Sequence, residues 1–104
     1  MQYQIMEYTL TDNGIEKDGK KVDIYDVISD IKNRVSMNNV SDSSFKVYKN
    51  GMVVYQITCG GIHKIYEEKH EGYTSIFAIC GNKAIIAVNE GNTTVWMSVA
   101  HYYE

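Results

Sequence analysis

The segment from Tyr73 to Tyr103 reads YTSIFAIC-GN-KAIIAVNE-GN-TTVWMSVAHYY, in which two Gly-Asn pairs separate three largely apolar runs. Runs rich in Ile, Val, Thr and aromatic residues that are bounded by Gly and Asn are typical of antiparallel strands joined by tight turns. Gly81-Asn82 suits a type II′ turn with glycine in the first central position, and Gly91-Asn92 marks the second turn. The segment therefore predicts a three-stranded antiparallel meander at the centre of the fold.

The turn lengths decide which side chains of this meander share a face. Two-residue turns place Ile79 opposite Ala84, Val88 opposite Val95, and Trp96 opposite Ala87. One face then provides an apolar seat for a helix, whereas the other stays largely apolar with nothing assigned to cover it. A turn longer by one residue would exchange the faces of one strand. The uncovered face, a candidate interface or ligand pocket, is expected to gather Trp96, Ile85, Ala87 and Ile76.

The upstream half contains the one clear helical pattern. Apolar residues recur at i, i+3, i+4, i+7 and i+11, which is one stripe of an amphipathic helix over about 23–36. Asp23 suits the N-cap, and Lys32 and Arg34 suit the C-terminal end of the helix dipole. The chain before it predicts a strand over 2–10 and a polar turn or loop over 11–21. The stripe consists of Ile24, Val27, Ile28, Ile31 and Val35.

Together these elements predict an α+β fold in a single domain, 1–104. The helix packs on an antiparallel meander of about 5–7 strands, which includes a hairpin around Asn50-Gly51. One helix covers only one face of a sheet. The second face must be covered by strong curling of the sheet, by the N-terminal strand and loop, or by a second chain in a homodimer or higher homo-oligomer. These alternatives stay open at this point.

Composition excludes several classes of protein. The longest uncharged apolar stretch falls well short of the roughly 18 residues that suggest a membrane-spanning helix. The first ten residues carry Glu7 and alternating Gln and Tyr, unlike a secretory signal or transit peptide. A net charge of −3 with Arg34 as the only arginine disfavours direct nucleic-acid binding. We therefore expect a cytoplasmic protein with neither a membrane nor a nucleic acid as its direct partner.

The acidic excess lies entirely in residues 1–45, which hold eight acids and five bases, whereas 46–104 hold five of each. Asp23, Asp26 and Asp30 would lie on the helix face opposite the apolar stripe, and Asp18 lies in the preceding loop. Such carboxylates suit a basic groove on another protein, where they would occupy the places of phosphates. The alternative is an ordinary solvated helix face.

Patterns for catalysis or metal binding are weak. Cys59, His63, His70 and Cys80 match no compact zinc motif. A tight turn at 71–72 would place His63 opposite Cys80, on the face that carries Trp96, but neither an oxyanion hole nor an orienting group can be located. We expect no enzyme, no cofactor and no metal. Nine tyrosines and one tryptophan leave a nucleotide-stacking pocket at an oligomer interface as an alternative.

These observations favour a small acidic binding protein. Abundant Ile, Lys, Tyr and Asn beside one Arg and no Pro indicate an A/T-rich genome, which fits a low-GC bacterium or its phages. The leading hypothesis is a phage or mobile-element accessory protein, active in the host cytoplasm, that inhibits a bacterial defence system. It would bind a host protein, for instance a nucleic-acid-binding effector, through its acidic helix and loop. The alternative is a protein that binds or sequesters a small nucleotide signal.

Overall fold

The computed structural model describes residues 2–35, 38–40, 44–49, 52–58 and 63–101, with side chains described over 2–35 and 65–101. This part of the chain forms one helix, α1 (Ile24–Arg34), and eleven strands. The strands are β1 (Tyr3–Ile5), β2 (Tyr8–Thr11), β3 (Gly14–Lys17), β4 (Lys20–Val22), β5 (Asn38–Val40), β6 (Ser44–Lys49), β7 (Met52–Thr58), β8 (His63–His70), β9 (Tyr73–Cys80), β10 (Lys83–Glu90) and β11 (Thr93–His101).

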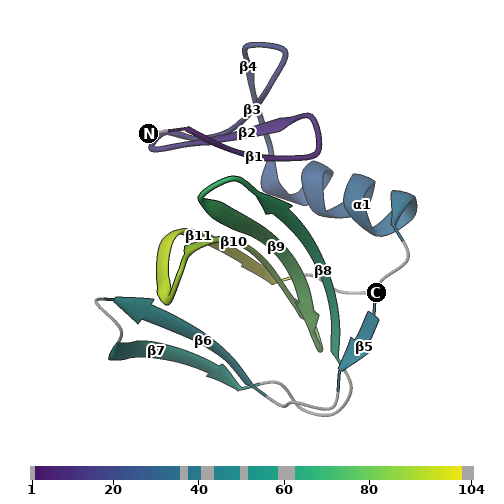
Figure 1. Ribbon diagram of the computed structural model, residues 1–104. Helices are drawn as coiled ribbons and strands as arrows, with labels where there is room; N and C mark the ends of the chain where they lie inside the picture. The colour runs from purple at the N-terminus through teal and green to yellow at the C-terminus, as the bar shows by residue number, and fades with distance from the viewer. Residues whose placement is uncertain (1, 36–37, 41–43, 50–51, 59–62, 102–104) are drawn as a thin grey trace.

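The described strands form three antiparallel sheets rather than one. A four-stranded sheet has the order β1-β2-β3-β4, a five-stranded sheet the order β11-β10-β9-β8-β5, and β6 pairs only with β7. Figure 1 shows α1 and the four-stranded sheet on one side of the five-stranded sheet, and the β6–β7 hairpin on the other. The α+β class is confirmed. The prediction of one meander of about 5–7 strands is wrong, because the chain divides its strands among separate layers.

The N-terminal region differs most from the sequence prediction. The expected strand over 2–10 and loop over 11–21 are in fact a four-stranded meander. The chain reverses after β1 with Met6 at φ 51°, and the β3–β4 hairpin turns at Asp18 and Gly19, which have φ 53° and 76°. Two consecutive positive φ values are those of a type I′ turn, for which Asp-Gly is a favoured pair. Strands of three or four residues are too short to show a clear alternation of apolar and polar residues, so the sequence pattern does not reveal them.

The helix prediction is confirmed in its core. The Asp23 side chain accepts a hydrogen bond of 2.8 Å from the backbone nitrogen of Tyr25, so Asp23 is the N-cap. Val27, Ile28 and Ile31 are buried. The helix ends at Arg34 rather than at 36, because Val35 is already extended, and residues 36–37 lie outside the described part.

The C-terminal meander has the predicted turns but not the predicted faces. Cys80 pairs with Lys83 and Glu90 with Thr93, so both Gly-Asn turns contain two residues, and Ile79 lies opposite Ala84. A β-bulge then follows next to Val88, which pairs with Trp96 instead of Val95. One extra residue in β11 moves every later side chain of that strand to the opposite face.

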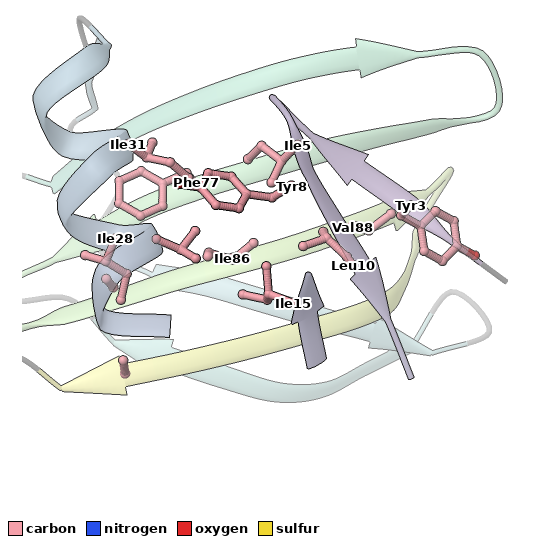
Figure 2. Close-up of a cluster of buried hydrophobic side chains, with 13 residues drawn as sticks. Tyr3, Ile5, Tyr8, Leu10, Ile15, Ile28, Ile31, Phe77, Ile86 and Val88 are labelled. Atoms are coloured by element: carbon pink, nitrogen blue, oxygen red, sulfur yellow. The ribbon is translucent and has the colours of Figure 1, made fainter. Parts of the chain in front are cut away.

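Two hydrophobic clusters lie on opposite faces of the five-stranded sheet. In the first, which we call the main cluster, side chains from α1 and from the four-stranded sheet pack toward the five-stranded sheet, as Figure 2 shows. They are Ile28 and Ile31 of α1 and Ile5, Tyr8 and Leu10 of the four-stranded sheet. On the sheet side, this main cluster contains Phe77, Ile86 and Val88, with Trp96 packed against it. The second, far-face cluster contains Ile76, Ala78, Cys80, Ile85 and Ala87, with Ile65 and Met97 packed against it.

The far face of the sheet is covered within the single chain. Ile85 and Ala87 are fully buried and Ile76 is nearly so. The β6–β7 hairpin lies on this side of the sheet in Figure 1. Its strands pair as predicted, with Lys49 opposite Met52, while the turn residues 50–51 lie outside the described part. The four-stranded sheet, which contains the expected N-terminal strand and loop, covers the other face.

Candidate functional site

The four aspartates of the predicted partner surface do not form one continuous patch. Asp18 is exposed at the tip of the β3–β4 hairpin, which rises away from α1 in Figure 1. Asp23 and Asp26 are exposed at the start of α1, and Asp30 is partly buried near its end. The exposed side chains of Lys20 and Lys21 on β4 separate Asp18 from the helix along the chain. The structure therefore brings together only the helical members of the set.

Asp30 is engaged inside the molecule. Its Oδ2 accepts a hydrogen bond of 2.5 Å from the Tyr8 hydroxyl and one of 3.1 Å from Arg34, one helical turn later. Arg34 also binds Glu7, so a chain of charged groups ties α1 to the β1–β2 turn. The hydrogen bond from Tyr8 lowers the pKa of Asp30, with Arg34 acting in the same direction against the effect of burial. Asp30 therefore stabilises the contact between α1 and β2.

Replacing Tyr8 with phenylalanine tests this contact. Tyr8 is buried, and burial together with Asp30 raises the pKa of its hydroxyl to about 12. At pH 7 we expect Tyr8→Phe to lower the free energy of unfolding by about 1.5–3 kcal/mol, as for a hydrogen bond to a charged group. A carboxyl with a lowered folded pKa stabilises above its unfolded pKa and loses that contribution as the pH falls through the folded value. The deficit should therefore shrink on acidification.

Urea unfolding at pH 7, 5 and 3 measures this deficit. Tyr25→Phe is the matched control, because its side chain is exposed and the substitution should change stability by no more than about 0.5 kcal/mol. A Tyr8→Phe deficit that is the same at every pH would show that the hydroxyl does not act through Asp30.

The helix surface contains a residue that the sequence interpretation did not single out. Tyr25 is 54% exposed, the highest value among the exposed large hydrophobic residues of the described chain. It lies between Asp23 and Asp26, whose side chains are also exposed. The available signal was its position off the apolar stripe, because an aromatic residue on the polar side of an amphipathic helix is not explained by the core. We call Asp23, Tyr25 and Asp26 the helix-start surface.

The second predicted set, around Trp96, is not gathered on one face. Ile76 pairs with Ala87 in the far-face cluster, together with Ile85. The bulge places Trp96 on the opposite face, where its indole nitrogen donates a hydrogen bond of 2.9 Å to the Thr11 carbonyl oxygen of β2. The prediction that Trp96 lies opposite Ala87 is therefore wrong. Trp96 joins β11 to the N-terminal sheet instead of forming a pocket with the other three residues.

Among the described residues, Cys80 does not provide a free thiol for the catalytic pair considered on the Trp96 face. The β8–β9 register is the one that a tight turn at 71–72 predicts, with His70 opposite Tyr73. Cys80 is disulfide-bonded and belongs to the far-face cluster, so its sulfur offers no thiolate. Cys59 and the His63 side chain lie outside the described part. Within that part, no group of three or more His, Cys, Asp or Glu side chains could hold a metal ion.

Several tyrosines considered for stacking are engaged in internal contacts. Tyr3 packs edge-on against Tyr73 with ring centroids 5.1 Å apart, and His70 stacks on Tyr73 at 4.4 Å. The Tyr3 hydroxyl donates to Glu90 at 2.7 Å. Glu68 accepts a hydrogen bond of 2.9 Å from the backbone nitrogen of Met6. This group of side chains fastens the N-terminal sheet to β8, β9 and β10, which gives these tyrosines a structural role.

Comparison of the chain with protein-family models, curated proteins and solved structures gives no match in any of the three. Within the described residues, α1 is far too short to cross a membrane, and no other helix is present. A functional conclusion must therefore come from the chemistry of the surface.

Proposed function

We propose that this chain is a small binding protein without catalytic activity, which docks its helix-start surface on a positively charged surface of another protein. The observation that carries this proposal is the exposed Tyr25 ring between two exposed carboxylates. Tyrosine is enriched at protein interfaces, because it offers a large contact area together with a polar hydroxyl. Among the described residues, Tyr25 belongs to neither hydrophobic cluster.

Arginine and lysine fit this surface better than other partner groups. A guanidinium can stack on the tyrosine ring and hydrogen-bond a neighbouring carboxylate. Asp26 has no side-chain hydrogen bond or ion pair among the described residues, so its charge is not neutralised as that of Asp30 is. Asp23 uses one carboxylate oxygen for the helix cap and keeps the other for a partner. Carboxylates and an aromatic ring together imitate the phosphate and base of a nucleic acid.

The partner class follows from that imitation. A protein that binds nucleic acid presents Lys and Arg in a groove, and an acidic protein can block such a groove. The abundance of Ile, Lys, Tyr and Asn, whose codons are A/T-rich, fits a low-GC bacterium or one of its phages. We therefore propose an accessory protein of a phage or mobile element that inhibits a host defence protein in the host cytoplasm. Asp18, on the separate hairpin tip, contributes a second point of contact.

A paired charge-reversal experiment tests the docking surface. Tyr25→Ala combined with Asp26→Lys removes the ring and reverses one charge, whereas Glu71→Lys makes the same charge change at the exposed β8–β9 turn. The three immobilised proteins are used to capture bacterial proteins for quantitative mass spectrometry. We expect basic nucleic-acid-binding proteins on the wild type and on Glu71→Lys, reduced by about 30-fold on the double variant, which corresponds to about 2 kcal/mol.

The outcome that contradicts the proposal is equally specific. If all three proteins retain the same basic partners in the same amounts, the helix-start surface does not bind them. Raised salt should weaken genuine capture, because the contact is electrostatic and exposed. Urea unfolding of the double variant checks that α1 remains folded, since a lysine in the first turn of a helix costs about 0.3–1 kcal/mol.

A further inference from the structure

The sulfur of Cys80, the last residue of β9, is disulfide-bonded. The chain contains two cysteines, so a bond within a single chain can join Cys80 only to Cys59. Cys59 lies outside the described part, but in the sequence it directly follows Thr58, the last residue of β7. Such a bond connects the end of β7 with the end of β9.

Cys80 belongs to the far-face cluster of the five-stranded sheet. Its side chain is 4% exposed, and Ile85 and Ala87 of the same cluster are fully buried. A sheet face is buried in this way only when another layer covers it. Among the described elements, Figure 1 shows the β6–β7 hairpin, and neither α1 nor the four-stranded sheet, on this side of the sheet. The hairpin is therefore the layer that Cys80 lies beneath.

The described strands of the hairpin are not part of the sheet that they cover. β6 and β7 pair with each other and with no other described strand, although β6 lies against β11. No strand ladder therefore fixes the hairpin to the five-stranded sheet within the described residues. A covalent bond from the end of β7 to the far-face cluster is a strong constraint on where such a hairpin lies.

We propose that the disulfide between Cys59 and Cys80 is a redox-sensitive latch, which holds the β6–β7 hairpin on the far face when oxidised and releases it when reduced. A dithiol reductant opens the bond in two steps. One of its thiolates attacks the bond and forms a mixed disulfide, and its second thiolate then displaces the protein sulfur. Overall the two cysteines gain two electrons and two protons, and the dithiol becomes a disulfide.

The latch responds to the redox state around the protein. The cytoplasm keeps thiols reduced, whereas oxidising conditions preserve a disulfide, so the latch opens in the first and closes in the second. Release uncovers the apolar far-face cluster on β9 and β10. The helix-start surface lies on α1, on the other side of the sheet in Figure 1, so the latch does not depend on the proposed partner binding.

Peptide mapping tests the pairing. Full-length protein is oxidised with glutathione disulfide and digested with trypsin in the absence of reductant. Mass spectrometry should find peptide 50–64, which contains Cys59, linked to peptide 70–83, which contains Cys80. Alkylation of both thiols in the oxidised protein overturns the proposal. A bond between the Cys80 residues of two copies overturns it as well.

Limited trypsin digestion with and without dithiothreitol measures the release. Cleavage after Lys46 and Lys49 of the hairpin should become at least about tenfold faster on reduction, because a disulfide suppresses opening of the loop that it closes. Cleavage after Lys20, which is exposed on β4, should keep its rate and serves as the internal control. Cys59→Ala should be cut at the faster rate with or without dithiothreitol. Cleavage of the hairpin that does not change on reduction overturns the proposal.

The fluorescence of Trp96 separates release of the hairpin from general unfolding. Trp96 packs on the main cluster, on the face opposite to Cys80, so its emission maximum should stay the same on reduction and in Cys59→Ala. An apolar dye should bind more strongly after reduction, because the far-face cluster is then uncovered. A Trp96 emission that shifts to that of the urea-unfolded protein overturns the latch, since reduction would then unfold the whole chain.

Discussion

Replacing Phe77 with alanine should remove about 3–5 kcal/mol from the free energy of unfolding. Phe77 has the largest volume of the fully buried side chains among the described residues. It lies in the main cluster beside residues of α1 and of the N-terminal sheet, as Figure 2 shows. Alanine would leave a cavity in the main cluster, where α1, the four-stranded sheet and the five-stranded sheet pack together. Since domains of this size are stable by only about 5–15 kcal/mol, a large share of the stability is at stake.

Urea unfolding followed by circular dichroism measures this loss. Phe77→Leu is the matched control, because it keeps most of the apolar volume and should cost less than about 1.5 kcal/mol. A loss below about 1 kcal/mol for Phe77→Ala would show that the helix and the N-terminal sheet do not pack on the five-stranded sheet at this position. It would contradict the layered core directly.

Replacing Trp96 with alanine is expected to have the second largest effect, near 3 kcal/mol, the lower end of the range for a large aromatic because the ring is only partly buried. The substitution removes both the ring that packs on the main cluster and the hydrogen bond to the Thr11 carbonyl. Trp96→Phe keeps most of the ring and should cost about 1 kcal/mol through the lost hydrogen bond. The difference between the two variants separates packing from hydrogen bonding.

Val95→Ala decides between the two registers of β11. If Val88 were opposite Val95, as turn lengths alone predict, Val95 would face the main cluster and its truncation would be costly. With Val88 opposite Trp96, Val95 is largely exposed, and Val95→Ala should change stability by no more than about 0.5 kcal/mol. A costly Val95→Ala beside a harmless Trp96→Ala would refute the bulged register. Because Trp96 is the only tryptophan, its fluorescence reports the same unfolding transition.

Features that depend on a few neighbouring residues could be predicted. The apolar stripe and the Asp23 cap determine α1, because both act within a few residues of one helix. Both Gly-Asn turns and the pairing of Ile79 with Ala84 follow from the conformational freedom of glycine at the turn. Asp18-Gly19 is also a typical pair for a tight turn, but the strands that flank it are too short for the sequence pattern to indicate a hairpin.

The candidate site could be predicted only in part. Acidic residues at the start of the helix were visible in the sequence, and Asp23 and Asp26 are exposed as expected. Asp30 has its charge engaged by Tyr8 and Arg34, and Tyr8 comes from a strand 22 residues earlier in the chain. No spacing rule within a helix could reveal that contact.

The sequence by itself determined the α+β class, the helix, the tight turns and the acidic character of the N-terminal half. Each of these depends on local periodicity, on the residues of a turn or on composition, which are properties of neighbouring residues or of the chain as a whole. Only the tertiary structure decided how the strands are divided among three sheets and which face of β11 is buried. The bulge beside Val88 lets the Trp96 ring pack on the main cluster and its indole reach Thr11, 85 residues away. Burying the Trp96 ring while its indole nitrogen is hydrogen-bonded outweighs the cost of the β-bulge. This balance depends on residues that come together only in the folded chain.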